Sequence, residues 1–188
     1  MRYAYKASLI GSAHRFELTD AGLGWHIGGK SGVWPYAGIS EIRLSYRPVS
    51  MQSRRFRADI ESASQGVSQG HLVLFSISWQ TAALMATQDQ DYRVFITQLH
   101  ARMKQAGSTA VLVGGLRPRI YAAAIVVLVL LAIAMTGLLV RAIATGELAG
   151  ILFLLGFAAL FTWQVGGFVR RNRPRAYTFD DLPLALLP

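Results

Sequence analysis

One stretch of this 188-residue chain has the spacing of a phosphate-binding loop. Residues 24–31 read GWHIGGKS and satisfy the pattern G-x-x-x-x-G-K-[ST], in which backbone amides, a lysine and a hydroxyl hold nucleotide phosphates. That chemistry needs a strand before the loop and a helix after it, because the helix N-terminus supplies amides. The residues after Ser31 are Gly-Val-Trp-Pro-Tyr, which do not begin a helix. We therefore expect a glycine-rich β-turn here and no nucleotide site.

Histidine is the next residue type that can carry catalysis or bind a metal, and the chain has four. They are scattered along the sequence: His14, His26, His71 and His100. None has a second histidine or a carboxylate three or four residues away on a recognisable helix, the spacing that puts two ligands on one face. We therefore expect no metal site and no cofactor.

Carboxylates occur as close pairs at three places: Asp59/Glu61, Asp89/Asp91 and Asp180/Asp181. The first pair shares a strand face that we expect to be solvated. The second pair lies at the start of a predicted helix, where negative charge is favoured. No serine lies in a nucleophile-elbow pattern, and the chain has no cysteine. The residues therefore predict a protein that is not an enzyme.

The chain is basic, with 19 Lys and Arg against 10 Asp and Glu and a net charge of +9. Its densest basic patch outside the apolar half consists of Arg47, Arg54, Arg55 and Arg57. Each such charge near an anionic lipid surface contributes about 1 kcal/mol, so the patch is a candidate contact for anionic headgroups or an acidic partner. The alternative is a solvated loop and strand edge. No dense basic run with interleaved aromatic residues indicates nucleic acid.

Two uncharged stretches, residues 120–140 and 148–169, dominate the second half of the chain. Each is long enough to cross a hydrocarbon core of roughly 30 Å at about 1.5 Å of helix rise per residue. Buried helices of a soluble core usually keep a polar face, and these have almost none. We therefore expect a two-helix transmembrane hairpin over residues 119–170.

Arginines flank the hairpin and predict its orientation. They are Arg117 and Arg119 before it, and Arg170, Arg171, Arg173 and Arg175 after it. Basic flanks stay on the cytoplasmic side, so we expect both termini in the cytoplasm and the last four arginines in contact with the anionic leaflet. The first 18 residues lack the apolar core of a signal peptide, so the first helix serves as the insertion signal. The expected location is a bacterial inner membrane, crossed twice.

Residues 1–107 have the alternating pattern of a β domain that ends in a helix. Strands are expected at 13–19, 23–27, 33–36, 39–46, 55–60 and 71–79, with one more within 81–90. The helix begins at Asp89 or Asp91 as its cap and ends at Gly107. Its apolar face consists of Tyr92, Phe95, Ile96, Leu99 and Met103. Residues 108–118 are expected to be a linker to the membrane, and residues 171–188 a basic flank and an apolar tail.

Six to seven antiparallel strands closed by a C-terminal amphipathic helix make a mainly-β domain. Residues 34–44, WPYAGISEIRL, place Trp34-Pro35-Tyr36 before Ile39 and Ile42 at the opening of a strand. With this motif, residues 13–106 resemble the pleckstrin-homology-like (PH-like) domains of bacterial membrane-anchored proteins. Phosphoinositide-binding members carry a basic pair in the first hairpin loop, whereas residues 20–22 here contain an Asp and no Lys or Arg. The resemblance therefore implies an adaptor or anchoring module.

The tail, residues 176–188, is apolar but contains two prolines, which prevent a stable lone helix. Its candidate docking residues are Phe179, Leu182, Leu184, Leu186 and Leu187. We expect the tail to dock on its own β domain or on a partner; the alternative is a frayed terminus.

These observations favour a non-catalytic accessory or scaffolding subunit of a bacterial inner-membrane protein complex. Its partners would be anionic membrane lipids and a membrane protein. The alternative is a membrane-tethered lipid- or ligand-binding sensor that uses the basic face of the β domain.

Overall fold

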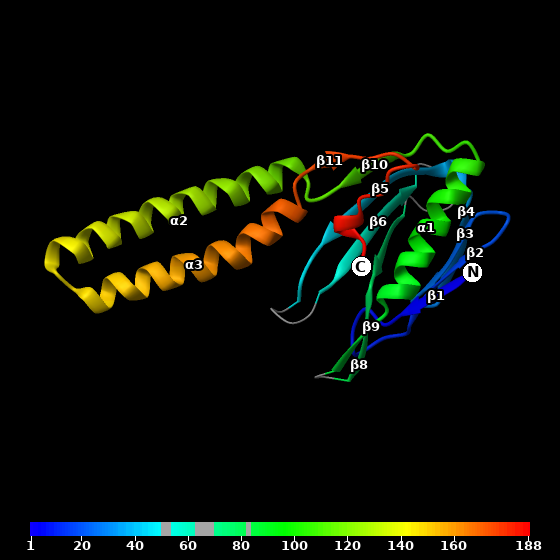
Figure 1. Cartoon of the computed structure of the whole chain (residues 1–188). Helices are drawn as coiled ribbons and strands as arrows, with labels where there is room; N and C mark the ends of the chain where they lie inside the picture. Colours follow the sequence, from blue (N-terminus) through cyan, green and yellow to red (C-terminus); the bar gives the residue numbers. More distant parts are fainter. Residues whose placement is uncertain (50–53, 63–69, 82–83) are drawn as a thin grey trace. The chain divides into compact units, whose positions relative to one another are not determined.

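The computed structural model describes residues 1–49, 54–62, 70–81 and 84–188, which form two units (Figure 1). The first unit is a β domain made of Met1–Gly115 and Arg175–Pro188, and the second, Leu116–Pro174, contains two long helices. The β domain was expected to end at residue 107. It instead takes in residues on both sides of the helices, so the helical hairpin is an insertion in the chain of the β domain.

A four-stranded antiparallel sheet opens the β domain, with its strands in chain order. The strands are β1 (Arg2–Tyr5), β2 (His14–Leu18), β3 (Leu23–Ile27) and β4 (Lys30–Trp34). Alternate side chains point into the core, as in Tyr3 and Tyr5 on β1 and Phe16 and Leu18 on β2. Strand β1, which precedes the first strand expected from the sequence, is therefore part of the core.

A five-stranded sheet faces it, in the order β11-β10-β5-β6-β7. Its strands are β5 (Ile39–Tyr46), β6 (Phe56–Ser62), β7 (His71–Phe75), β10 (Val111–Gly114) and β11 (Arg175–Ala176). Strand β10 runs parallel to β5, and the other pairs are antiparallel. A short 3-10 helix, Tyr36–Gly38, leads into β5. Two tyrosines of β1 join the sheets, since Tyr3 donates to the Phe75 carbonyl and Tyr5 to the Val73 carbonyl.

The stretch 71–79 was expected to be one strand, and the structure divides it at Ser76. The Ser76 N–H donates to the carbonyl of Phe56 at 3.0 Å, and its hydroxyl accepts from the Phe56 N–H at 3.0 Å. This buried anchor ends β7 and turns the chain into β8 (Ile77–Thr81), which pairs with β9 (Leu84–Thr87). The described residues thus form eleven strands, more than the six to seven expected.

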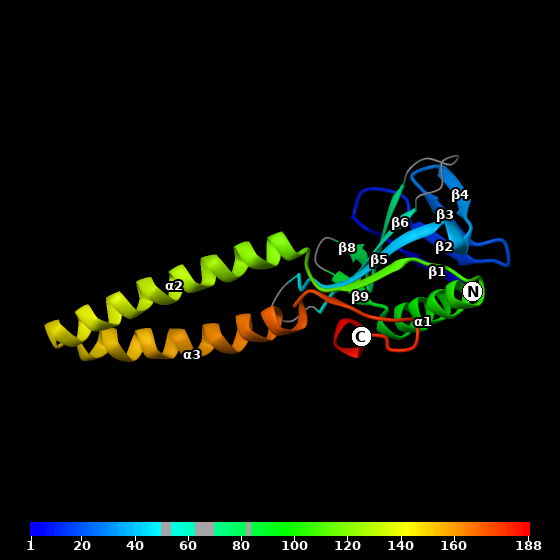
Figure 2. The ribbon, with the colours of Figure 1, turned by 90° about the horizontal axis from the view of Figure 1, so that it is seen from above.

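Helix α1 (Asp89–Gln105) closes the core. Its buried face contains the expected apolar residues and also His100. Acidic residues lie in its first turn and basic residues in its last turn, which favours the helix dipole at both ends. Gln88 precedes the first turn and makes no side-chain cap, so neither Asp89 nor Asp91 has the capping position that the sequence predicted. Figures 1 and 2 show α1 beside both sheets and the tail.

The segment 108–118, expected to be a linker, contributes strand β10. Leu112 is buried in the core, and Val111–Gly114 pairs in register with Glu41–Leu44 of β5. A strand of only four residues, directly before a long apolar helix, is too short for its alternating pattern to be recognised in the sequence. The linker prediction was therefore wrong.

The tail packs on its own β domain. Strand β11 pairs with β10, and the Tyr177 N–H continues the ladder by donating to the Leu112 carbonyl at 3.1 Å. Leu186 and Leu187 are buried in the core, where Leu186 fills the space beside Gly114. Phe179 and Leu182 are partly buried against the same core. Leu184, also expected to dock, is 69% exposed because the short 3-10 helix Leu184–Leu186 turns it away.

The second unit consists of α2 (Pro118–Thr145) and α3 (Leu148–Arg171), joined by a tight turn. Gly146 ends α2 with a φ of 70°, the left-handed conformation that glycine adopts most easily. Both helices extend beyond the apolar stretches from which they were predicted. Both are long and apolar enough to cross a membrane.

The buried end of the tail gives a first prediction. Replacing Leu186 with Ala should lower the free energy of unfolding by about 2–5 kcal/mol, because it leaves a cavity beside Gly114. Leu184→Ala, which removes the same atoms from an exposed site, should change it by less than about 0.5 kcal/mol. Denaturant unfolding of the full chain in mild detergent measures both. Equal effects of the two changes would contradict the packing described for the tail.

Candidate functional site

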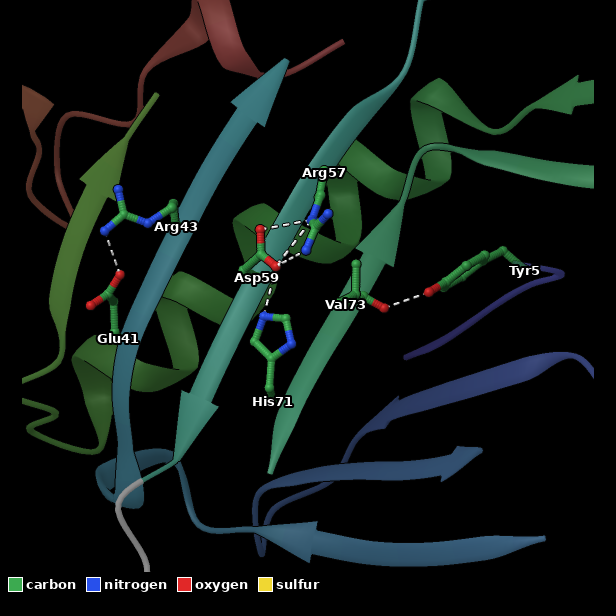
Figure 3. A network of polar contacts seen from close by, with 7 residues as sticks. All are labelled: Tyr5, Glu41, Arg43, Arg57, Asp59, His71 and Val73. Atoms are coloured by element: carbon green, nitrogen blue, oxygen red, sulfur yellow. Dashed lines mark hydrogen bonds and ion pairs between the residues drawn. The ribbon is translucent and has the colours of Figure 1, made fainter. Parts of the chain in front are cut away.

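The outer face of the five-stranded sheet carries a group of charged side chains, among them Glu41, Arg43, Arg57, Asp59 and His71 (Figure 3). Residues that alternate with the buried ones on β5, β6 and β7 form rows across the strands. In order along the sheet, the rows are Glu41, Glu61 and His71; then Arg43, Asp59 and Val73; then Ser45, Arg57 and Phe75. The register therefore brings together charged residues up to 30 positions apart.

Asp59 is the centre of this face. Its side chain is buried, and it accepts from Nε of Arg57 at 3.0 and 2.8 Å and pairs with Nε2 of His71 at 2.7 Å. A buried carboxylate needs such partners, because an isolated charge out of water is costly. The prediction that Asp59 lies on a solvated face was therefore wrong. Arg57 and His71 cover it from its own strand and from the neighbouring strand.

The Asp59–His71 pair fixes the histidine ring with Nε2 toward the carboxylate. A general base needs this kind of orientation, and it also needs a nucleophile or substrate group at its other nitrogen. Within the described residues, no side chain bonds to Nδ1 of His71. The described residues also contain no group of three His, Cys, Asp or Glu that could hold a metal ion. The geometry pairs charges and holds the ring, and it brings no reacting group to it.

Arginines gather at one end of the face. Two hydrogen bonds join Arg47 and Arg55. The backbone N–H of Arg47 donates to the Arg55 carbonyl at 2.8 Å, and the side-chain Nε of Arg55 donates to the Arg47 carbonyl at 3.0 Å. The guanidinium of Arg55 lies 4.8 Å from the ring centre of Phe75, and that of Arg57 lies 5.7 Å from it. Burial, and then the positive charges of Arg57 and Arg47, lower the pKa of Arg55. We call Arg47, Arg55 and Arg57 the basic end. Arg54, beside it in sequence, is exposed.

The basic end lies where the chain leaves the β domain for the helices. Gly114, the last residue of β10, pairs with Leu44 on one side and with Arg175 on the other. Along the chain, Leu44 of β5 is followed by Ser45 and then by Arg47. The residue where the chain leaves the β domain, the residue where it returns and the basic end therefore lie at the same end of the sheet. The carboxylates of the first row lie toward the opposite end.

The other predicted basic residues divide between the two units. Arg175 is exposed in β11 of the β domain, whereas Arg170, Arg171 and Arg173 belong to the helical unit. Arg170 and Arg171 occupy the last turn of α3, where positive charge is favoured by the helix dipole.

The stretch with phosphate-loop spacing is a β-hairpin, as predicted. Gly28 and Gly29 form the turn between β3 and β4 with φ values of 58° and 81°, which glycine adopts without strain. Lys30 pairs with Ile27 and Ser31 with His26, so the residues after the turn are in a strand.

His100 joins the tail to α1. It is fully buried, its Nδ1 lies 2.8 Å from the Ile96 carbonyl, and its Nε2 lies 3.0 Å from the Tyr177 hydroxyl. The carbonyl can only accept, so Nδ1 carries the proton and Nε2 accepts from Tyr177. Burial lowers the pKa of His100 and raises that of Tyr177. No local pattern in the sequence indicates this pair, because 77 residues separate its members.

Comparisons with models of protein families, with curated proteins and with solved structures found no match. The resemblance to PH-like domains stays a prediction.

The pairing of Asp59 gives a second prediction. Asp59→Asn keeps the shape of the side chain but removes the charge that Arg57 and His71 hold, so it should cost roughly 1–3 kcal/mol of stability. Asp181→Asn, an equal change at an exposed position, should cost less than about 0.5 kcal/mol. Denaturant unfolding of the full chain compares them. A loss no larger than that of the control would show that the pairing contributes nothing to stability.

His100 gives a third prediction. Because its pKa is lowered in the folded protein, its contribution to stability is complete above the unfolded value of about 6.5 and is lost as pH falls from there through the folded pKa. The full chain should therefore be less stable at pH 5 than at pH 7.5. His100→Gln should reduce this loss, and His14, whose pKa burial also lowers, contributes equally to both proteins. Thermal melts at the two pH values measure the difference, and parallel pH profiles would contradict it.

Proposed function

We propose that this protein is a non-catalytic accessory or scaffolding subunit of a bacterial inner-membrane protein complex. Its PH-like β domain lies on the cytoplasmic side and makes the protein contacts, and its helical hairpin crosses the membrane.

The observation that carries the proposal is the insertion of the hairpin between two paired strands. Gly114 and Arg175 are register partners of β10 and β11, and antiparallel partners have their Cα atoms about 4.5–5.5 Å apart. Both ends of the hairpin are thus tied to one edge of one domain. A hairpin held in this way has both ends on the same side of a membrane. The arginines in both flanks favour the cytoplasmic side.

An attachment through two neighbouring strands suits a domain whose task is to be presented at the membrane. The outer face of the four-stranded sheet offers a contact surface for a partner, since it is hollowed to a volume of about 620 Å³. Its lining includes Arg2, Arg15, Gly24, His26 and Val33. Apart from Glu17, which Arg2 already pairs, the charged groups of this surface are basic, so it favours an acidic partner surface.

A tagged pull-down of the full chain from native membranes in mild detergent, resolved on a native gel, tests the proposal. We expect a stoichiometric complex with a membrane protein, and we expect Arg15→Glu, in the lining of the hollow, to weaken it. The matched control is Gln98→Glu with Gln105→Glu, which makes the same change of two charges on the exposed side of α1.

A chain that migrates alone or only with copies of itself would contradict the accessory role. Truncation of the tail is unsuitable for mapping the contact, because Leu186 and Leu187 belong to the core of the β domain. The alternative, a lipid- or ligand-binding sensor, draws its support from the basic end, where the guanidinium groups of Arg55 and Arg57 lie near the ring of Phe75.

A further inference from the structure

Within the described residues, the two large sheets have four edge strands: β1, β4, β7 and β11. An edge strand presents unpaired backbone N–H and C=O groups, so proteins usually cover it or keep it short. On β7, the carbonyls of Val73 and Phe75 accept from the hydroxyls of two tyrosines of β1. Strand β8 covers the end of β1, where the Trp79 N–H donates to the Lys6 carbonyl at 3.1 Å. Strand β11 is only two residues long. Three of the four edges are therefore engaged or very short.

Strand β4 is the fourth edge, and its backbone groups alternate in direction. Its turn with β3 has two residues, both with positive φ, so the pair that flanks the turn exchanges hydrogen bonds. Hydrogen-bonded and non-bonded pairs alternate from there, so the N–H and C=O groups of Ser31 and Val33 point away from β3. In the part of the chain that the structure describes, no hydrogen bond reaches these four groups. The edge can therefore accept another strand.

Positive charge lies beside this edge. Arg15, His26 and Ser31 form one row across β2, β3 and β4. Arg15 and Lys30, which precedes Ser31 at the turn, are both exposed, and neither pairs with a carboxylate among the described residues. An Asp or Glu of an added strand, placed opposite Ser31, would extend this row with Lys30 as its nearest cation. The charges beside the edge therefore favour an acidic strand.

The next outward-facing position along the edge is apolar. Val33 lies on the same face as Ser31 and is 45% exposed. It pairs with Gly24, which has no side chain, and both belong to the lining of the hollow. An apolar residue opposite Val33 would bury its side chain against it and reach toward the space over Gly24. The edge therefore fits a strand with an acidic and an apolar residue two positions apart.

We propose that the outer edge of β4 binds an extended acidic segment of the partner protein as an added strand. The inference rests on the proposed function and specifies the surface that the partner uses. The backbones of Ser31 and Val33 provide the hydrogen bonds, whereas Lys30 and Arg15 select acidic residues. Main-chain hydrogen bonds give such added strands their affinity, and alternate side chains give them their specificity. A second copy of β4 would instead add positive charge to a positive edge.

The test titrates the full chain in non-ionic detergent with a fluorescein-labelled peptide, Thr-Glu-Thr-Val-Thr-Glu-Thr, and follows fluorescence anisotropy. This peptide reads the same in both directions, so it presents glutamate and valine on one face whichever way it pairs with β4. We expect saturable binding. The same peptide with lysine in place of both glutamates should bind at least about tenfold more weakly.

Val33→Pro removes one outward N–H and leaves the hydrogen bonds between β3 and β4 in place, and the preceding Gly32 tolerates a proline after it. It should weaken peptide binding by about tenfold or more. The matched control, Val33→Ile, keeps the N–H and the apolar contact and should change binding less than about twofold. Thermal melts establish whether each variant is folded.

A second variant tests the charge without touching the backbone. Arg15→Glu with Lys30→Glu changes only exposed side chains and should reverse the preference, so that the lysine peptide binds more tightly than the glutamate peptide. This variant decides if Val33→Pro does not fold. No binding of the glutamate peptide, an unreversed preference, or equal binding of folded Val33→Pro and Val33→Ile proteins would each overturn the proposal.

The peptide titration needs no partner protein. Absence of a complex on the native gel would therefore contradict the accessory role and leave the peptide site intact. A complex formed by a chain that binds no peptide would overturn only the strand addition, so the two failures are distinguishable.

Discussion

The pairing of β10 with β11 is the contact on which the rest of the β domain depends. It joins a strand made before the long helices to one made after them, and it brings Leu186 and Leu187 into the core. Until the chain returns, Leu112 and Gly114 have no covering on that side, and a hydrophobic core with an open side loses both burial and packing. The β domain is therefore complete only when the helical hairpin has brought the two halves of its chain together.

This arrangement changes how the tail is understood. An apolar segment that follows two long apolar helices has the composition of a partner-binding peptide, yet here its hydrophobic residues are used within the domain. Tyr177 extends the ladder by its backbone and reaches His100 by its hydroxyl, and Lys104 pairs with Asp180. The tail is thus held on the domain by backbone hydrogen bonds, by a buried polar pair and by the burial of apolar side chains. In the proposed function, protein contacts would therefore be made by the sheet faces.

The two outer sheet faces differ in their chemistry, and this difference supports separate roles. The five-stranded sheet carries ion pairs in its middle and arginines at the end where the chain exits. The four-stranded sheet is hollowed near Gly24, which has no side chain to fill the space. In the proposed function, the face of the four-stranded sheet is the one that contacts a protein partner.

Local patterns in the sequence determined the helical hairpin, the helix α1 and strands such as β3 and β5, because hydropathy and periodicity act over neighbouring residues. The glycine-rich turn at Gly28 and Gly29 was likewise local. Tertiary structure alone decided that β10 is a strand, that the tail belongs to the core, and that Asp59 and His100 are paired. Each of these features depends on contacts between residues that are distant in the chain. Bringing such residues together costs loop-closure entropy, and this cost is offset only when the whole core forms. A short apolar segment or a lone histidine has no signal of its own until that core exists.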